Sequence, residues 1–110
     1  MQGFYGIYYT GQTGAAAFGL LLYDGRVYSV DATGGDVSGT YFERADGGLD
    51  LALVFSWPAG AVLVTGQTLS QATTVPANVT ITAATLAGGH QTVELPVGRV
   101  NVRVVRKVTI

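Results

Sequence analysis

The sequence predicts an all-β fold, a small antiparallel up-and-down barrel of about eight strands in one domain, residues 1–110. Short segments rich in aromatic and β-branched residues alternate with glycine-rich turns along the chain, as in all-β domains. No repeat period and no low-complexity linker interrupts them, so a repeat array or a second domain is not supported. We favour a barrel over a sandwich because closure removes aggregation-prone edge strands.

The clearest local signal is the stretch 19–41. Asp24-Gly25 separates two apolar runs, and this dipeptide is typical of a two-residue hairpin whose type I′ turn needs positive φ at both positions. A second turn, Thr-Gly-Gly-Asp at 33–36, leads into a strand that ends near Tyr41. We therefore expect a three-stranded meander around which the other strands pack.

The first two strands are expected at residues 4–9 and 15–23. The first is aromatic and β-branched and lies between glycines. In the second, Phe18, Leu20 and Leu22 alternate on one face. Gly19 inside this run marks either a bulge or a close approach of another group.

Three more strands are expected in the first half, at 26–31, 37–44 and 49–56. The turn at 45–48, Ala-Asp-Gly-Gly, has the flexibility that positive φ requires. Pro58 ends the last of these strands, because proline cannot donate to a ladder. That strand shows the cleanest alternation, and we assign to the core its residues Leu49, Leu51, Leu53 and Phe55.

The second half is rich in threonine and valine, which favours strands over helices. One short helical turn near Pro76 is the alternative, and Gly88-Gly89 is expected to be a hairpin turn. The expected strands are 61–65, 68–74, 79–86 and 91–95.

The last strand is expected at 99–108. Valines alternate with polar residues up to Val104, and then Val105 falls on the polar face and Arg106 on the apolar face. One inserted residue restores the alternation, so we predict a β-bulge near Val104-Val105.

Charge is sparse and unevenly distributed. The net charge is −1, which argues against nucleic-acid binding, because binders that neutralise phosphates carry a basic excess. Six of the seven acids precede residue 51 and four of the six bases follow residue 98. A barrel brings its first and last strands together, so the acidic and basic strands are expected to pair across it.

The location of the protein is also predicted from composition. The sequence has no cysteine, no apolar run of about 18 residues and no basic residue before Arg26. These features exclude disulfides and thiolate metal sites, and support neither a transmembrane helix nor a secretory signal. We expect a cytoplasmic protein that does not associate with membranes.

The residues suggest no catalytic chemistry. His90, the only histidine, and Glu94 lie about 13 Å apart if they are on one strand, too far to share a metal ion. No Gly-x-Ser-x-Gly motif is present to expose a nucleophile. We expect no enzyme, no cofactor and no metal site. The aromatic residues either fill the core or line a cavity for an apolar small molecule: Phe4, Tyr5, Tyr8, Tyr9, Tyr23, Tyr28, Tyr41, Phe42, Phe55 and Trp57.

From about residue 4 to 108 the sequence resembles the GrlR-type negative regulators of type III secretion. The resemblance lies in short strand and turn motifs: Gly6-Ile7-Tyr8, Gly19-Leu20-Leu21-Leu22 followed by a turn at Gly25, Gly34-Gly35-Asp36, Thr40-Tyr41-Phe42, and Val62-Leu63 with the stretch to Pro76. It implies a calycin-like (lipocalin-like) barrel, commonly dimeric, that binds and restrains a transcriptional activator and is not an enzyme.

In that family the partner contact is associated with acidic residues in a hairpin. The corresponding residues here are Glu43, Asp46 and Asp50, which we call the acidic turn, with Arg44 interrupting them. The resemblance therefore implies a protein partner at the acidic turn, and a homodimer. Two alternatives stay open: a carrier that holds an apolar small molecule inside the barrel, and an interaction protein that dimerises through the uncharged middle of the chain.

Overall fold

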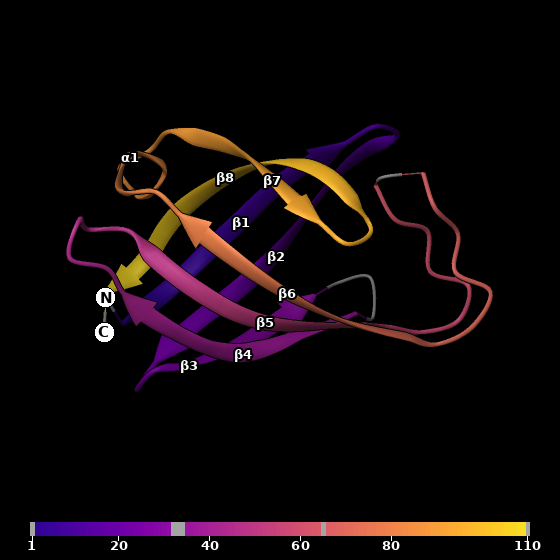
Figure 1. Ribbon diagram of the computed structural model, residues 1–110, viewed down its shortest axis with the longest axis horizontal. Coiled ribbons are helices and arrows are strands. Elements are labelled where there is room, and N and C mark those ends of the chain that lie inside the picture. Colours follow the sequence, from indigo (N-terminus) through magenta and orange to yellow (C-terminus); the bar gives the residue numbers. More distant parts are fainter. Residues whose placement is uncertain (1, 32–34, 65, 110) are drawn as a thin grey trace.

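The computed structural model of the protein describes residues 2–31, 35–64 and 66–109. In this part of the chain eight strands form a single antiparallel sheet that curls into a nearly closed barrel (Figure 1). One short helix lies between the sixth and seventh strands. The elements are β1 (Gly3–Gly11), β2 (Gly14–Tyr23), β3 (Arg26–Asp31), β4 (Asp36–Glu43), β5 (Leu49–Trp57), β6 (Thr73–Ile81), α1 (Ala83–Leu86), β7 (His90–Leu95) and β8 (Gly98–Thr109). The predicted small all-β barrel is confirmed.

The sheet order is β6-β5-β4-β3-β2-β1-β8-β7. Neighbours in the sequence pair as hairpins, and the first strand pairs with the last over eight residue pairs. The sheet therefore opens between β6 and β7. The side chain of Gln91 bridges part of this seam, since its Oε1 accepts from Thr82 N at 2.9 Å and its Nε2 donates to Thr80 O at 2.8 Å.

The central meander forms as predicted from turn chemistry. Asp24 and Gly25 have φ values of 52° and 75°, as a type I′ turn requires. The strands β2, β3 and β4 then follow one another in the sheet. The expected turn at 33–36 lies mostly outside the described residues. At Gly19 both ladders run without a register shift, and the ring of Phe4 occupies the space that a Cβ would need, so a close approach and not a bulge explains this glycine.

The pairing between β3 and β4 is short. Among the described residues Arg26↔Thr40 and Val27↔Gly39 are the pairs of this ladder, and beyond them Val37 N donates to the hydroxyl of Ser29 at 2.8 Å. A side chain thus replaces the backbone acceptor for the N–H of a buried residue.

We expect Ser29→Ala to destabilise the protein by about 1–2 kcal/mol, because the N–H of Val37 loses its partner in a partly buried position. Urea unfolding monitored by circular dichroism measures the effect. The matched control is Ser38→Ala, at an exposed position on the next strand, which should change the stability by less than about 0.5 kcal/mol. Equal losses in both variants would contradict the role of the Ser29 hydroxyl.

The prediction for residues 61–74 is wrong in detail. Residues 58–64 and 66–72 belong to a long connection between β5 and β6, which we call the strap, and within it Val62 and Thr68 make one isolated bridge. The gap expected between the strands 68–74 and 79–86 is also wrong, since β6 runs from Thr73 to Ile81 straight through Pro76, and so is the alternative of a helical turn there. β6 pairs only with β5, and a proline fits an edge strand because no neighbour needs its N–H.

The expected strand 79–86 ends early, and the helix lies there and not near Pro76. Thr82 caps α1, its hydroxyl accepting from Thr85 N at 3.2 Å. Gly88 has φ 112°, and Gly89 N donates to Ala84 O at 3.0 Å. The glycine pair therefore ends a helix as a Schellman motif and is not the predicted hairpin turn. In the described part of the chain α1, at four residues, is far too short to span a membrane.

The predicted bulge is displaced. Val104 and Val105 pair regularly with Ile7 and Gly6, so the ladder runs through them. The register shifts two residues later, where Phe4 pairs with Val108 and Tyr5 with Arg106, leaving Lys107 as the extra residue. Arg106 still follows the inner-face alternation, since it pairs with Tyr5, but its side chain is exposed near the end of β8. The break in the polar pattern therefore does not mark a bulge at Val104-Val105.

Three of the four basic residues of β8 meet aromatic rings, and the fourth, Arg99, pairs with Glu94 on β7. Arg103 and Lys107 lie 5.7 and 5.5 Å from the ring of Tyr8, and Arg106 lies 5.7 Å from the ring of Tyr5. The first and last strands are adjacent as expected, but β1 carries no acid, so cation–π contacts take the place of the expected charge pairing.

Candidate functional site

The barrel encloses an apolar cavity of about 170 Å³. Inward-facing side chains of most strands line it, among them Ile7, Leu20, Val37, Leu51 and Val104. In the described part of the chain its lining holds no charged side chain, and only Tyr9 and Trp57 carry a polar atom beyond the backbone. The sequence left open whether the barrel interior is filled or holds a cavity. In the structure the core surrounds a cavity.

One end of the barrel is closed. Tyr5, Leu22, Val27 and Leu49 are each exposed by at most 2%, and α1 lies at this end together with both termini (Figure 1). Tight packing of these side chains forms the floor beneath the cavity.

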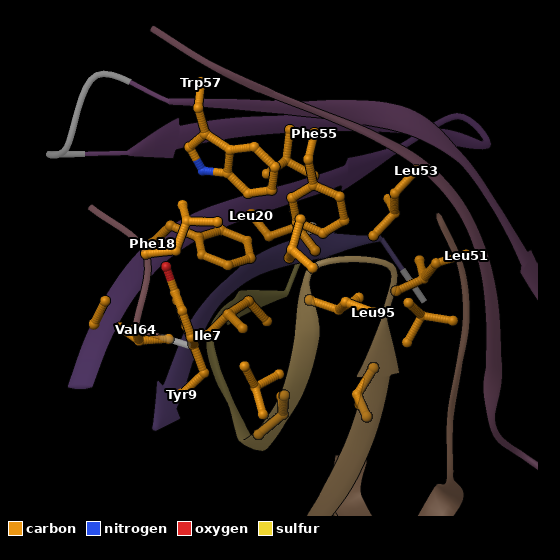
Figure 2. A pocket seen from close by; sticks show the side chains of 18 of the residues that line it. Ile7, Tyr9, Phe18, Leu20, Leu51, Leu53, Phe55, Trp57, Val64 and Leu95 are labelled. Carbon is orange, nitrogen blue, oxygen red and sulfur yellow. The ribbon is translucent and has the colours of Figure 1, made fainter. Parts of the chain in front are cut away.

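The other end, which we call the mouth, is less tightly covered. Two aromatic pairs stand there: Phe55 and Trp57 are stacked with centroids 5.5 Å apart, and Tyr9 meets Phe18 edge-on at 5.7 Å (Figure 2). Tyr9, Phe18 and Trp57 are half-buried. Of the ten aromatic residues named from the sequence, Tyr5 packs in the floor and Tyr41 lies partly buried against the core. Only three of the ten line the cavity: Tyr9, Phe55 and Trp57. The other five are exposed: Phe4, Tyr8, Tyr23, Tyr28 and Phe42.

The strap crosses the mouth. Leu63 and Leu69 anchor it, each exposed by 8%, and residues 61–64 contribute to the cavity lining. Its far side is tied to the turn between β1 and β2, because Val64 O accepts from Thr13 N at 2.9 Å and from Thr13 Oγ1 at 3.1 Å. The Thr13 hydroxyl also lies 3.5 Å from Leu63 O, so the described part of the strap is held against the β1–β2 turn beside the mouth.

An unfilled cavity of this size weakens the protein. The side chains that line it lose the packing contacts that a filled core would supply. Larger side chains at several lining positions would recover part of these contacts. A cavity kept at such a cost is typical of a binding site.

The acidic turn lies between β4 and β5, at the closed end and away from the mouth (Figure 1). Arg44 binds two of its three carboxylates, with Nε 3.2 Å from Asp46 Oδ2 and Nη1 3.1 Å from Asp50 Oδ1. Asp46 also accepts from Gly48 N at 2.9 Å, and Asp50 accepts from Thr80 Oγ1 at 2.7 Å. These carboxylates stabilise the hairpin itself, and their charge is partly neutralised within it.

The same contacts make the hairpin sensitive to acid. The Gly48 N–H and then Arg44 hold the pKa of Asp46 below its usual 3.8, and the Thr80 hydroxyl and then Arg44 lower the pKa of Asp50. Groups with a lowered folded pKa stabilise the fold above their unfolded pKa, and this stabilisation is lost as pH falls through the folded value.

We therefore expect the melting temperature of the protein to fall more steeply between about pH 5 and pH 3 than that of the double variant Asp46→Asn/Asp50→Asn. The variant removes both groups whose pKa is lowered and leaves Arg44 in place. Thermal unfolding across this pH range checks the prediction. Parallel pH profiles for the two proteins would contradict it.

His90 and Glu94 occupy one strand, β7, as the sequence analysis assumed. Glu94 Oε1 is 2.6 Å from Arg99 Nε on β8, so its partner is a base and not the histidine. No group of three or more potential metal ligands occurs among the described residues.

Sequence reasoning named only three of the aromatic residues that line the cavity, Tyr9, Phe55 and Trp57, and it missed Phe18 and the strap. Its residues read as two strands because threonine and valine favour extended structure. The available signal was Pro58 with glycines at 60 and 66, which both have positive φ.

Comparison with protein-family models, with curated proteins and with solved structures finds no match to this chain. The resemblance to GrlR-type regulators therefore stays a prediction.

Proposed function

We propose that this protein binds a small apolar molecule inside its barrel. The observation that carries the proposal is the cavity of about 170 Å³ with a lining of uncharged side chains, open toward an aromatic mouth. Apolar cavities of about 150 Å³ stay dry and accept benzene. A ligand with one ring or a short chain fits this volume.

Toluene is a suitable probe, and Trp57 reports its binding. Trp57 is the only tryptophan and lines the cavity, so a bound ring changes its fluorescence. We expect saturable quenching or a spectral shift of the Trp57 fluorescence, with a dissociation constant for toluene of about 0.1–1 mM. This corresponds to a binding free energy near about −5 kcal/mol, which is within the range for a ligand of this size.

Two leucine substitutions on β2 make a matched pair. Ala16 lines the cavity, whereas its neighbour Ala17 is exposed on the outer face. Ala16→Leu should weaken toluene binding by at least about 10-fold and raise the melting temperature, because the added methyl groups fill the void. Ala17→Leu should leave toluene binding unchanged. Equal binding by both variants, or no saturable binding by the unaltered protein, would overturn the proposal.

The regulatory role implied by the resemblance is the second candidate, with a protein such as a transcriptional activator as partner and a homodimer as the assembly. The exposed positions of Glu43 and Asp46 support it, and Asp50 beside them is half-buried. The pairing of Asp46 and Asp50 with Arg44 weakens the field that the acidic turn offers to a basic partner. The test compares capture of a candidate activator by the Glu43→Lys and Asp46→Lys variants with capture by the unaltered protein. Equal capture would count against the regulatory role. Sedimentation at increasing concentration tests the homodimer.

A further inference from the structure

The cavity has a polar group at one end only. Trp57 and Tyr9 stand at the mouth, and the deeper lining, including Ile7, Leu20 and Leu51, is aliphatic. Tyr9 has further contacts within the protein. Within the described residues, the indole N–H of Trp57 donates to no acceptor. A half-buried donor at the edge of an apolar cavity is therefore available to a ligand.

The orientation of the indole suits this role. Its ring stacks on Phe55 at an interplanar angle of 14°, which holds it in place. Figure 2 shows the indole nitrogen on the ring edge that is turned toward Phe18, at the mouth. An acceptor that reaches this edge lies beside the aromatic pairs while the rest of the molecule extends toward the floor.

The lining also sets the charge of the ligand. All its side chains in the described chain are uncharged, so nothing in the cavity compensates a carboxylate or an ammonium group. Moving an unpaired charge into such a site is far more costly than moving a carbonyl or an ether oxygen. Neutral acceptors are thus selected over anions of the same shape.

We infer that the ligand is a compact neutral molecule with an apolar body in the barrel and one hydrogen-bond acceptor at the mouth, bonded to the indole N–H of Trp57. This inference rests on the proposed function, because it assigns the chemistry of a molecule bound in the same cavity. Small aromatic or short-chain ketones, aldehydes and ethers have this chemistry.

Three molecules of nearly identical shape test the inference: α-methylstyrene, acetophenone and benzoate, which present a methylene group, a carbonyl and a carboxylate at the same place. Binding to the unaltered protein and to Trp57→Phe is measured by calorimetry. Trp57→Phe keeps an aromatic ring beside Phe55 and removes the donor. Because Trp57 lines the cavity, the variant alters the packing of all three ligands, and α-methylstyrene reports that shared effect. We expect acetophenone to be weakened about 3- to 10-fold more than α-methylstyrene, the range for one hydrogen bond. Benzoate should bind the unaltered protein at least about 10-fold more weakly than acetophenone does.

A second readout uses the unaltered protein alone. Its single tryptophan gives one indole N–H resonance in ¹H–¹⁵N spectra, which acetophenone should shift downfield more than α-methylstyrene does. If α-methylstyrene binds and acetophenone shows neither the loss in Trp57→Phe nor the downfield shift, the inference is wrong while the proposed function stands. Binding of benzoate as tight as that of acetophenone also overturns the inference. Failure of all three molecules to bind overturns the proposed function as well.

Discussion

Gly39→Ala is expected to destabilise the protein by about 3–5 kcal/mol, enough to unfold a large fraction of the molecules. Gly39 pairs with Val27 on one side and Leu53 on the other, and its φ of 153° is one that side chains rarely adopt. A Cβ at this position would clash with the carbonyl oxygen of Ala52, which belongs to a paired strand and cannot move away. Glycine thus allows β4 to approach β5 closely where the barrel bends.

Urea unfolding monitored by circular dichroism measures this loss, and absence of a folded baseline is its extreme form. Gly14→Ala is the matched control, because a Cβ at Gly14 meets no atom within 4 Å. It should change the stability by less than about 0.5 kcal/mol. If the free energy of unfolding of Gly39→Ala lies within about 1 kcal/mol of that of the unaltered protein, β4 and β5 do not approach each other as closely as described.

Leu22→Ala is expected to cost about 3–5 kcal/mol as well, for a different reason. Leu22 is exposed by 1% and packs in the floor of the barrel, where the surrounding strands cannot collapse into the space it leaves. The neighbouring Leu21 faces outward and is half-buried, so Leu21→Ala should cost about 1 kcal/mol.

The two leucine variants are compared by denaturant unfolding under conditions in which both are mostly folded. Toluene binding by the folded Leu22→Ala protein should stay within about 2-fold, because Leu22 does not line the cavity. Equal losses of stability would mean that the floor is no better packed than the outer face. A large loss of binding would place Leu22 in the ligand site.

The first half of the fold could be predicted because its signals are local. The Asp24-Gly25 turn depends on the conformational preferences of two residues, and the alternation in β5 depends on which side chains avoid water. Each predicted strand from residue 4 to 56 has a counterpart in the structure within two residues at either end. Such features need no knowledge of distant neighbours.

In the second half the strands expected at 91–95 and 99–108 are confirmed as β7 and β8. The stretch 58–89 and the bulge in β8 could not be predicted, because these residues take their conformation from the sheet. Pro76 is compatible with β6 only because that strand lies at an open edge, which depends on where the barrel fails to close. The polar pattern near Arg106 predicts a bulge at Val104-Val105, whereas the pairing with β1 shifts the register only at Lys107. Val62 and Leu63 belong to a strap whose position depends on Thr13, about fifty residues earlier in the chain.

The same division holds for the candidate site. The sequence by itself determined an all-β chain with few charges, a set of aromatic residues and an acidic turn, because composition and turn chemistry act over a few residues. Only the tertiary structure decided that some aromatic side chains surround the mouth of a cavity and that Arg44 pairs with Asp46 and Asp50. A void is a property of how all strands pack together, and an ion pair depends on where side chains meet, so neither is encoded in any one segment.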